Sequence, residues 1–487
     1  MESSLHILEK KLQELWKLQK LNSRLKTLEG EEIQVIYPGD LNKENAGPDF
    51  TNARIKIGNF LYTGDVEIDV DYNNWKTHGH NINSKHNKVI LHVCLKNAHN
   101  QLYVYSKDGR RIVSVCIKPY ISSEIYSELS QPIEDEHEQN FTKCHYVADV
   151  IDFEIKKKFI SSLGINRFDQ KSEKIFRRLK ELAYIKTLKL NEPVIRYEMH
   201  PDFEKKEFFK TDFINKDLWE QVFYEKIFEA LGYSKNKNEM MKLAQYANLD
   251  FLRKFNNDKN SLNLIESSLF NISGLIHKAE NIDNEYLKSI HENWKYIQKI
   301  YDGETMRESE WQFMRMRPQN FPTIRIAGGA QIAHAIIHEN LIANISKKIS
   351  EIHNFNVLAK SLRSLFIIRA KGYWKNHFVF NNQGNSEIRY FVGISRADEI
   401  IVNVVLPFFY LYFNVFDKKE TSKKILKFYS NYFLTSENRI ITEVAESLQV
   451  KDLLKKSIYA QGLLELFRNY CAKKKCDECE IGKSVFN

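Results

Sequence analysis

The chain has 487 residues, of which 43% are hydrophobic, 13% aromatic and 28% charged, and its formal net charge is +9. This composition predicts a globular protein of about two to four domains and excludes a fibrous or largely disordered chain. Six cysteines in a chain of this length exclude a disulfide scaffold, and a charge of +9 is too dilute to identify nucleic acid as the partner by itself.

Residues 1–16 carry charge throughout and lack an apolar core, which excludes a secretory signal. The most apolar run, residues 400–416, contains Asn403, Pro407 and Asn414 and is shorter than the ~20 residues of a membrane span. We therefore expect a buried helix or strand pair there, no membrane span, and a cytoplasmic protein.

Hydrophobic periodicity predicts a helix over residues 5–28, a mostly antiparallel sheet up to residue 118, and helices almost everywhere after residue 150. The acidic stretch 130–140 indicates a linker. The predicted fold class is α+β, with an N-terminal restriction-endonuclease-like α/β sheet domain before a large, mostly helical region. The predicted domains are residues 1–130 (sheet domain), 131–149 (linker), 150–305 (basic helical domain) and 306–487 (helical domain with a cysteine-rich tail).

Residues 154–189 hold eleven Lys or Arg and four acidic residues on a predicted helix. This excess of positive charge favours either a solvated helix face or a surface that contacts phosphates. The sequence leaves both interpretations open.

Acidic and histidine residues are densest between Pro38 and Leu95. Asp49 precedes one predicted strand, and Asp65, Glu67 and Asp69 alternate on the next, so the three carboxylates share one face. Three carboxylates on one face repel one another unless a cation lies among them, and oxygen ligands suit Mg²⁺ or Mn²⁺. The alternative is a sheet with a solvated acidic face.

Four histidines follow these carboxylates, namely His78, His80, His86 and His92. His78 and His80 can reach one site and would shift the preferred metal towards Mn²⁺ or Zn²⁺. We expect His86 and His99 at the surface and His92 on the polar face of its strand.

This pattern resembles the PD-(D/E)xK nuclease core, in which a helix precedes a strand with Pro-Asp and a hairpin strand with Glu-x-Lys. Pro48-Asp49 matches the first element and Glu67-Ile68-Asp69 the second, with Asp69 in place of the lysine. The resemblance implies that Asp49, Glu67 and Asp65 or Asp69 bind the metal. Lys56, Lys96, His78 or His80 would then replace the missing lysine, and Glu14 would add an acid.

Three cysteines, Cys471, Cys476 and Cys479, lie within nine residues at the end of the chain. Their spacing suits Zn²⁺ or an iron–sulfur cluster, either of which normally takes four ligands. The fourth ligand would be Cys144, with His145 beside it, or another distant residue. The alternative is a set of unliganded thiols.

Residues 308–328 combine Arg315, Arg317 and Arg325 with two prolines and three aromatic residues. Paired guanidinium groups beside aromatic rings suit nucleic-acid binding. The competing interpretation is a structural joint in which Trp311 and Phe313 are buried.

Six segments together resemble a bacterial family of unknown function, domain-of-unknown-function family 2851. They are AGPDFTNARI, GDVEIDV, the run from Trp75 to His80, VILHV, RMRPQNFPTIRIA and YCAKKKCDECEIG. The resemblance implies a bacterial cytoplasmic protein and no particular activity. The leading hypothesis is a metal-dependent nuclease-like protein acting on nucleic acid. The alternatives are a non-catalytic binding module on a degenerate nuclease core and a subunit of a protein assembly.

Overall fold

The computed structural model forms two compact units from segments that alternate along the chain. Unit 1 contains Met1–His137 and Trp311–Phe321, and unit 2 contains Glu138–Glu310 and Pro322–Asn487. The structure describes residues 2–21, 24–42, 47–98, 101–122, 124–126, 143–187, 201–255, 258–276, 284–313, 316–380, 382–384, 386–436 and 438–486. Residues on both sides of the predicted boundary at 305 belong to unit 2, which is interrupted from Trp311 to Phe321.

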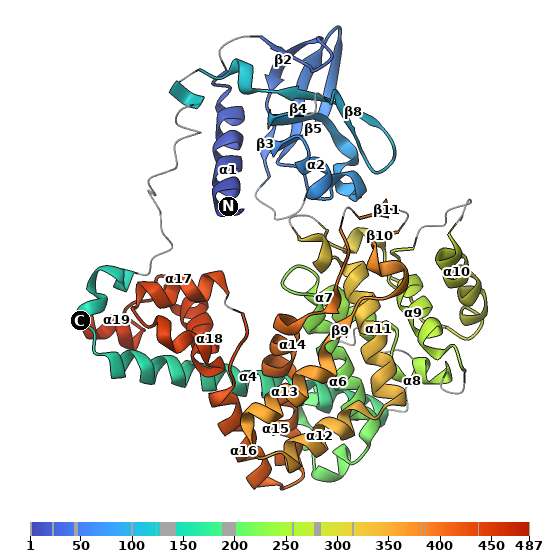
Figure 1. Cartoon of the computed structure of the whole chain (residues 1–487), viewed down its shortest axis with the longest axis vertical. Coiled ribbons are helices and arrows are strands. Elements are labelled where there is room, and N and C mark those ends of the chain that lie inside the picture. The colour runs from blue at the N-terminus through green and yellow to red at the C-terminus, as the bar shows by residue number, and fades with distance from the viewer. Residues whose placement is uncertain are drawn as a thin grey trace. The chain divides into compact units, whose positions relative to one another are not determined.

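Unit 1 begins with helix α1 (Glu2–Leu18) and continues as a sheet (Figure 1). The strands are β1 (Leu25–Lys26), β2 (Glu32–Tyr37), β3 (Asp40–Leu41), β4 (Phe50–Ile57), β5 (Phe60–Asp71), β6 (Val89–Lys96), β7 (Tyr103–Tyr105) and β8 (Arg111–Cys116). Their order in the sheet is β1-β2-β4-β5-β6-β8-β7, and β3 pairs with β4. The predicted α+β class is confirmed at this level.

Strands β4 and β5 form a hairpin in which Ile57 faces Phe60 across the turn at Gly58 and Asn59. The predicted antiparallel character is only partly correct, because β5 pairs with β6 and β6 with β8 in parallel. Parallel neighbours need a crossover connection, and the segment from residue 72 to 88 supplies it between β5 and β6. This crossover contains α2 (Asn74–Thr77), η1 (His80–Ile82) and η2 (Ser84–Lys88).

The two faces of this sheet are different. One face packs against α1 through an apolar core that includes Trp16, Ile68 and Val93. The other face lies under the crossover and combines a smaller apolar cluster, including Trp75 and Val89, with buried polar residues. Alternation along β5 therefore directs Val66, Ile68 and Val70 into the main core and the intervening acids to the other face.

Helix α1 ends ten residues before the predicted end. Gln19 adopts a left-handed backbone with φ of 51°, which terminates the helix, and Leu25–Lys26 pairs with β2 instead. A short η3 helix (Lys118–Tyr120) follows β8. Most of the predicted linker lies outside the described residues, but its end forms η4 (Lys143–Val150), which packs on unit 2.

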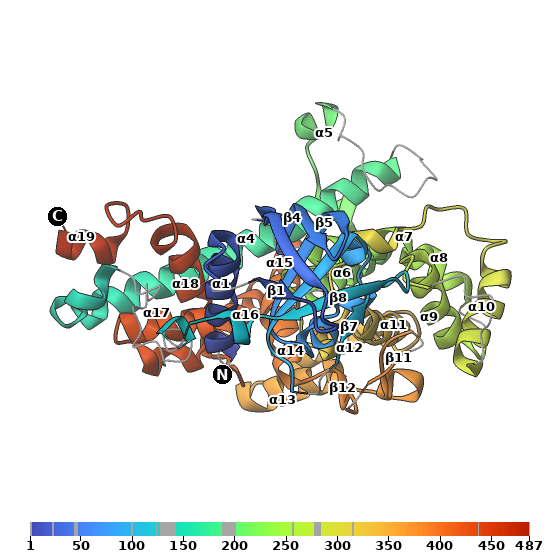
Figure 2. The same ribbon diagram turned by 90° about the horizontal axis from the view of Figure 1, so that it is seen from above.

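Unit 2 is mostly helical (Figure 2). Its longest helices are α4 (Phe153–Thr187), α6 (Lys216–Leu231), α10 (Glu285–Ile297), α11 (Pro322–His338) and α16 (Lys419–Asn431). The other helices are α5 (Pro201–Lys205), η5 (Lys210–Phe213), α7 (Lys237–Tyr246), α8 (Leu249–Leu252), η6 (Arg253–Phe255), α9 (Ser261–Ile272), η7 (Glu308–Glu310), α12 (Leu341–Glu351), α13 (Phe355–Phe366), η9 (Gly372–Lys375), α14 (Ile394–Ile400), η10 (Ile401–Val405), α15 (Leu406–Val415), α17 (Arg439–Ser447), η11 (Lys451–Lys455), α18 (Ser457–Leu466), η12 (Phe467–Cys471) and α19 (Glu480–Phe486). Two small sheets pair β9 (Ile368–Arg369) with β12 (Tyr390–Val392) and β10 (His377–Val379) with β11 (Asn382–Gln383). In unit 1, η8 (Pro318–Asn320) is the 3-10 turn of the returning segment.

Helix α4 confirms the helix predicted from residue 152 to 187, but several of its basic residues point inward. Lys156 is buried and donates to the carbonyl oxygens of Ala148 and Leu448. Lys171 donates to Gln461, and Arg178 forms two hydrogen bonds with Glu225. These groups stabilise unit 2 and do not belong to a solvated phosphate-binding stripe.

The apolar run predicted as a buried element is a helix. Residues Ile394–Val415 form one helical stretch that is long and apolar enough to cross a membrane, and 67% of its most apolar window is buried inside the protein. It contains a π-helical segment, Ile401–Val405, just before Pro407. This burial is that of a core helix.

Candidate metal centre

Strand β5 places two carboxylates in the interior of unit 1. Glu67 and Asp69 are 2% and 1% exposed, and both project from the face opposite α1. Glu67 and Asp69 therefore share one face, as predicted, and the alternative of a solvated acidic face is wrong because both are buried. Two buried carboxylates are costly unless positive charge or a metal ion compensates them.

Four histidines from the crossover and from β6 surround these carboxylates. His78 and His80 flank Gly79, whose φ of +80° lies in the left-handed region that glycine adopts readily. This turn allows both imidazoles to face β5. His86 comes from η2 and His92 from β6, next to Glu67 in the parallel register.

The imidazole nitrogens lie close to the carboxylate oxygens. His80 Nε2 is 3.1 Å from Glu67 Oε1, and His86 Nε2 is 3.5 Å from Glu67 Oε2. His78 Nδ1 is 3.2 Å from Asp69 Oδ1, and His92 Nε2 is 3.3 Å from Asp69 Oδ2. His80 Nε2 also lies 3.7 Å from Asp69 Oδ1, so this ring contacts both carboxylates.

Aromatic and polar neighbours fix the imidazole rings. The Trp75 ring lies 5.3 Å from His80, 5.9 Å from His86 and 5.4 Å from His92, measured between centroids. His92 Nδ1 is 3.1 Å from Ser114 Oγ, which orients its other nitrogen towards Asp69. Such outer hydrogen bonds hold the rings of metal-binding histidines in place.

The electrostatics of the cluster separate its acids. Burial opposes the ionisation of Asp69, but the charge of His80 and hydrogen bonds from the histidine rings outweigh it, so the pKa of Asp69 is well below its usual range. Asp65 is also buried, and burial raises its pKa despite a hydrogen bond from the Asn52 backbone at 3.3 Å. Asp69 is thus the acid held as a carboxylate.

Two sets of three residues have the geometry of a metal site. Glu67, His80 and His86 form one set, and Asp69, His78 and His80 form the other, with the ligand atoms of each set within 4.8 Å of one another. The buried Nδ1 of His80 has no hydrogen-bond partner among the described residues. Mixed imidazole and carboxylate ligands fit Mn²⁺, Zn²⁺ or Fe²⁺ better than Mg²⁺. The residues therefore fit a transition-metal ion.

Asp49 lies beside Glu67, as predicted, but its carboxylate oxygens contact α1 and the backbone of β5. Its Oδ1 accepts a hydrogen bond from Gln13 Nε2 at 2.9 Å, and its Oδ2 accepts one from the Ile68 N–H at 3.0 Å. The Asp49 N–H donates to Glu67 Oε2 at 3.1 Å. Asp49 therefore connects α1 to β5 and orients Glu67, and the two metal-binding sets do not include it.

Further predictions fail at this site. Lys56 and Lys96 are exposed, and Lys56 faces Leu61 near the hairpin turn, so neither replaces the missing lysine. Glu14 is exposed on α1, where Gln13 makes the contact. His86 was expected at the surface but is fully buried. His99 lies outside the described residues.

The predicted arginine group is divided by the structure. Arg317 is exposed on the Trp311–Phe321 segment of unit 1, and Arg315 lies outside the described residues. Arg325 belongs to unit 2, where it is 5% exposed and donates to the carbonyl oxygen of Phe391 and the hydroxyl of Tyr233. Burial and these two contacts direct the Arg325 guanidinium into unit 2.

The aromatic residues of the same segment follow the structural interpretation. Trp311 and Phe313 are buried, as expected of a joint, and Phe313 packs edge-on against Phe321 at 5.1 Å between centroids. A β-carbon at Gly79 would lie 3.8 Å from the Phe321 ring, so the segment reaches the turn between His78 and His80.

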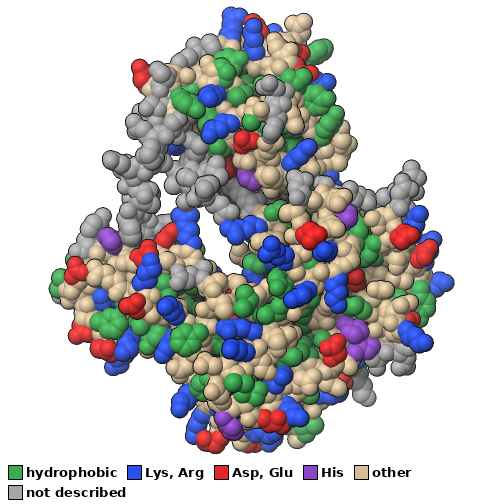
Figure 3. Space-filling model, viewed as in Figure 1, with side chains coloured by type: hydrophobic (Ala, Val, Ile, Leu, Met, Phe, Trp, Pro, Cys, Tyr) green, Lys and Arg blue, Asp and Glu red, His purple; other side chains and the backbone are tan. Residues whose placement is uncertain are grey.

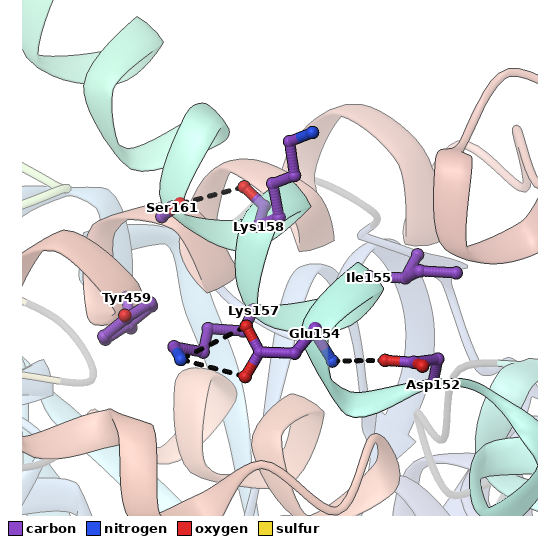
Figure 4. A pocket seen from close by; sticks show the side chains of 7 residues that line it. All are labelled: Asp152, Glu154, Ile155, Lys157, Lys158, Ser161 and Tyr459. Atoms are coloured by element: carbon purple, nitrogen blue, oxygen red, sulfur yellow. Dashed lines mark hydrogen bonds and ion pairs between the residues drawn. The ribbon is translucent and has the colours of Figure 1, made fainter.

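A hollow lies at the start of α4 (Figure 4). On its wall Lys157 Nζ lies 3.0 Å from Glu154 Oε1, and the Glu154 N–H donates to Asp152. On the visible face of unit 2, Lys and Arg are interspersed with Asp and Glu (Figure 3).

Unit 1 is thus a mixed sheet with a buried carboxylate–histidine cluster. The profile of a family described as a protein of unknown function (DUF2851) matches residues 9–186 and 204–438. The chain therefore belongs to this family. No curated protein and no solved structure matches the chain.

Proposed function

We propose that unit 1 is a metal-dependent phosphodiesterase of the nuclease type that acts on nucleic acid. The observation that carries the proposal is the pairing of two buried carboxylates with histidines in two ligand sets that share His80. The order of the elements supports it. Helix α1 comes first, Asp49 directly precedes β4, and β4 forms an antiparallel hairpin with β5, which carries Glu67. This is the arrangement on which the resemblance to PD-(D/E)xK nucleases rests.

The residues would have distinct roles. Glu67, His80 and His86 would hold one ion, and Asp69 with His78 would extend the site. A bound divalent ion polarises a phosphodiester and lowers the pKa of an attacking water. Asp49 would orient Glu67 through its backbone N–H.

His78 is the histidine of this site that solvent reaches most readily among His78, His80, His86 and His92. Its side chain is 30% exposed, whereas His80 is 1% exposed. His78 would therefore carry a proton between solvent and the Asp69 side of the cluster. Arg317, exposed on the segment that reaches Gly79, would bind a phosphate of the substrate.

A second function has its own support. Glu67, Asp69, His80, His86 and His92 are each at most 2% exposed, and such closure is typical of a structural metal site. In that case unit 1 would be a binding module on a degenerate nuclease core, and metal would stabilise it without catalysis.

The test compares cleavage and stability in the same protein. Labelled single- and double-stranded DNA and RNA are incubated with metal-stripped protein to which Mn²⁺, Zn²⁺ or Mg²⁺ is returned. Cleavage that requires metal and falls at least about 100-fold in Glu67→Gln supports the phosphodiesterase. Glu32→Gln, an exposed acid on β2, is the control that should retain activity.

Two outcomes count against the proposal. Metal that raises the melting temperature without any cleavage supports the structural alternative. If added metal changes neither the cleavage rate nor the melting temperature, the proposed metal site is overturned. Binding of nucleic acid that survives metal removal, with no cleavage, would assign unit 1 to the binding modules.

A further inference from the structure

Four of the six cysteines converge in unit 2. Cys144 lies on η4 near the beginning of the unit, and Cys471, Cys476 and Cys479 lie in the last turns before α19. Cys144, Cys479 and Cys471 belong to one apolar cluster, and α19 packs against η4. All four thiols are free of disulfides.

The thiols are close enough to influence each other's ionisation. Burial first, and then the thiols of Cys479 and Cys476, raise the pKa of Cys144 to about 11. Burial and the three other thiols raise the pKa of Cys471 to about 12.

The backbone around the thiols is closely folded. The Lys474 N–H donates to the Cys471 carbonyl at 3.0 Å, and Lys474 has a left-handed φ of 56°. A β-carbon at Gly482 would lie 2.1 Å from the Cys476 carbonyl oxygen, so glycine is required for α19 to approach this loop. The N–H groups of Gly482 and Ile481 favour the thiolate of Cys479, although burial raises its pKa.

We propose that Cys144, Cys471, Cys476 and Cys479 form a four-thiolate metal centre that fastens the beginning of unit 2 to its end. In this proposal Cys144 is the fourth ligand, because η4 packs against α19, which directly follows Cys479. Four thiolates suit Zn²⁺ or an iron–sulfur cluster, since both are soft centres that take four cysteine ligands.

The centre would connect positions that are far apart in the sequence. Linking residue 144 to residues 471–479 closes a loop of more than 300 residues, so the link restricts the unfolded chain strongly. Its role is therefore to stabilise unit 2. It is independent of the carboxylate–histidine cluster, which belongs to unit 1.

The test measures metal in the full chain, purified without exposure to oxygen. We expect about one zinc ion, or about four iron ions with visible charge-transfer absorption and acid-labile sulfide, per chain beyond any metal bound by unit 1. To separate the two sites, the measurement is made in the Glu67→Gln background. Finding zinc would identify the centre as a zinc site, and finding iron with sulfide would identify it as an iron–sulfur cluster.

Matched cysteine variants locate the metal. Cys144→Ser and Cys471→Ser should each lose the metal, whereas Cys116→Ser, on β8 of unit 1, should retain it. Metal that persists in both Cys144→Ser and Cys471→Ser overturns the proposal, as does wild-type protein with neither zinc nor iron.

A second measurement avoids dependence on folded variants. Alkylation of the wild-type protein, followed by mass spectrometry, reports each thiol before and after a strong chelator. We expect the four cysteines to react together only after chelation, with a lower melting temperature of unit 2. Equal reactivity with and without chelator contradicts a metal centre.

Discussion

Gly79 is the residue that most directly controls the carboxylate–histidine cluster. Its left-handed backbone lies between His78 and His80, which both contact Asp69. A β-carbon at this position meets Ile82 at 3.6 Å, an ordinary contact, so the cost of a side chain here lies in the backbone conformation.

We predict that Gly79→Ala destabilises the protein by about 1 kcal/mol and weakens metal binding at the cluster. The matched control is Gly109→Ala, since Gly109 also has φ of 80° but lies in the turn between β7 and β8 with no neighbour within 4 Å of a β-carbon. Both variants should lose similar stability in urea unfolding. Metal titration should separate them, and equal affinity in both contradicts a positioning role for Gly79.

Glu266 on α9, in unit 2, has a pKa that is shifted into the neutral range. Burial raises its pKa to about 7, although hydrogen bonds with Tyr286 and Trp374 oppose the shift. Trp374 Nε1 also donates to the Tyr286 hydroxyl at 2.6 Å. Because the folded pKa exceeds the unfolded value, the folded state holds the proton more tightly.

Because of Glu266, we expect the folded protein to lose stability as the pH rises. Its contribution is complete below the unfolded pKa of about 4.3 and disappears as the pH rises through about 7. Glu266→Gln should therefore be more stable than wild type at pH 8.5 by up to about 2 kcal/mol, with a smaller difference at pH 5. Urea unfolding at both values measures this, and a pH-independent difference would show that Glu266 does not titrate in this range.

Helices α4 and α18 approach each other closely at two glycines. A β-carbon at Gly164 would lie 2.1 Å from the Ile458 carbonyl oxygen, and one at Gly462 would lie 1.9 Å from the Ile160 carbonyl oxygen. At each glycine, the missing side chain leaves room for the backbone of the opposite helix. The contact cannot be kept with any larger side chain.

We predict that Gly462→Ala destabilises unit 2 by about 2–4 kcal/mol, because the two helices must separate. Intrinsic helix propensity alone predicts the opposite sign, since alanine is favoured over glycine in helices by about 1 kcal/mol. Asn166→Ala, at an exposed position of α4, is the control and should change stability by less than about 0.5 kcal/mol. Thermal unfolding that finds Gly462→Ala neutral or stabilising contradicts this packing.

The elements that the sequence predicted well are those with a clear period. Strict alternation identified β5 and the shared face of Glu67 and Asp69, and helical spacing identified α4 and α6. The prediction of helices almost everywhere after residue 150 did not separate α12, which ends at Glu351, from α13, which begins after its N-cap Asn354. Short caps of this kind interrupt a helix without changing the apolar spacing around it.

The part of the site that sequence could not give lies in the crossover. His86 belongs to a 3-10 helix of five residues, where no period distinguishes a buried side from an exposed one. The parallel pairing of β5 with β6 was also missed, because parallel and antiparallel neighbours have similar strand sequences here. Asn83, which caps η2 through its contact with the Lys85 N–H, was the available signal for this short helix.

The whole molecule consists of two units with separate apolar cores. The core around Trp16 and Ile68 is built from unit 1, and the core around Ile160 and Leu463 is built from unit 2. We therefore expect two thermal transitions in calorimetry. Gly79→Ala should lower one and Gly462→Ala the other, because each substitution acts within its own unit. A single transition shifted by both variants would contradict independent unfolding.

The segment Trp311–Phe321 has a consequence for the order of events during synthesis. Every strand of the unit 1 sheet has been made by residue 116, but Trp311, Phe313 and Phe321 belong to the same unit and emerge about 200 residues later. At about 5–20 residues per second, the ribosome needs roughly 10–40 s for that interval. The unit 1 sheet must therefore wait, without its last segment, until residue 321 has been translated.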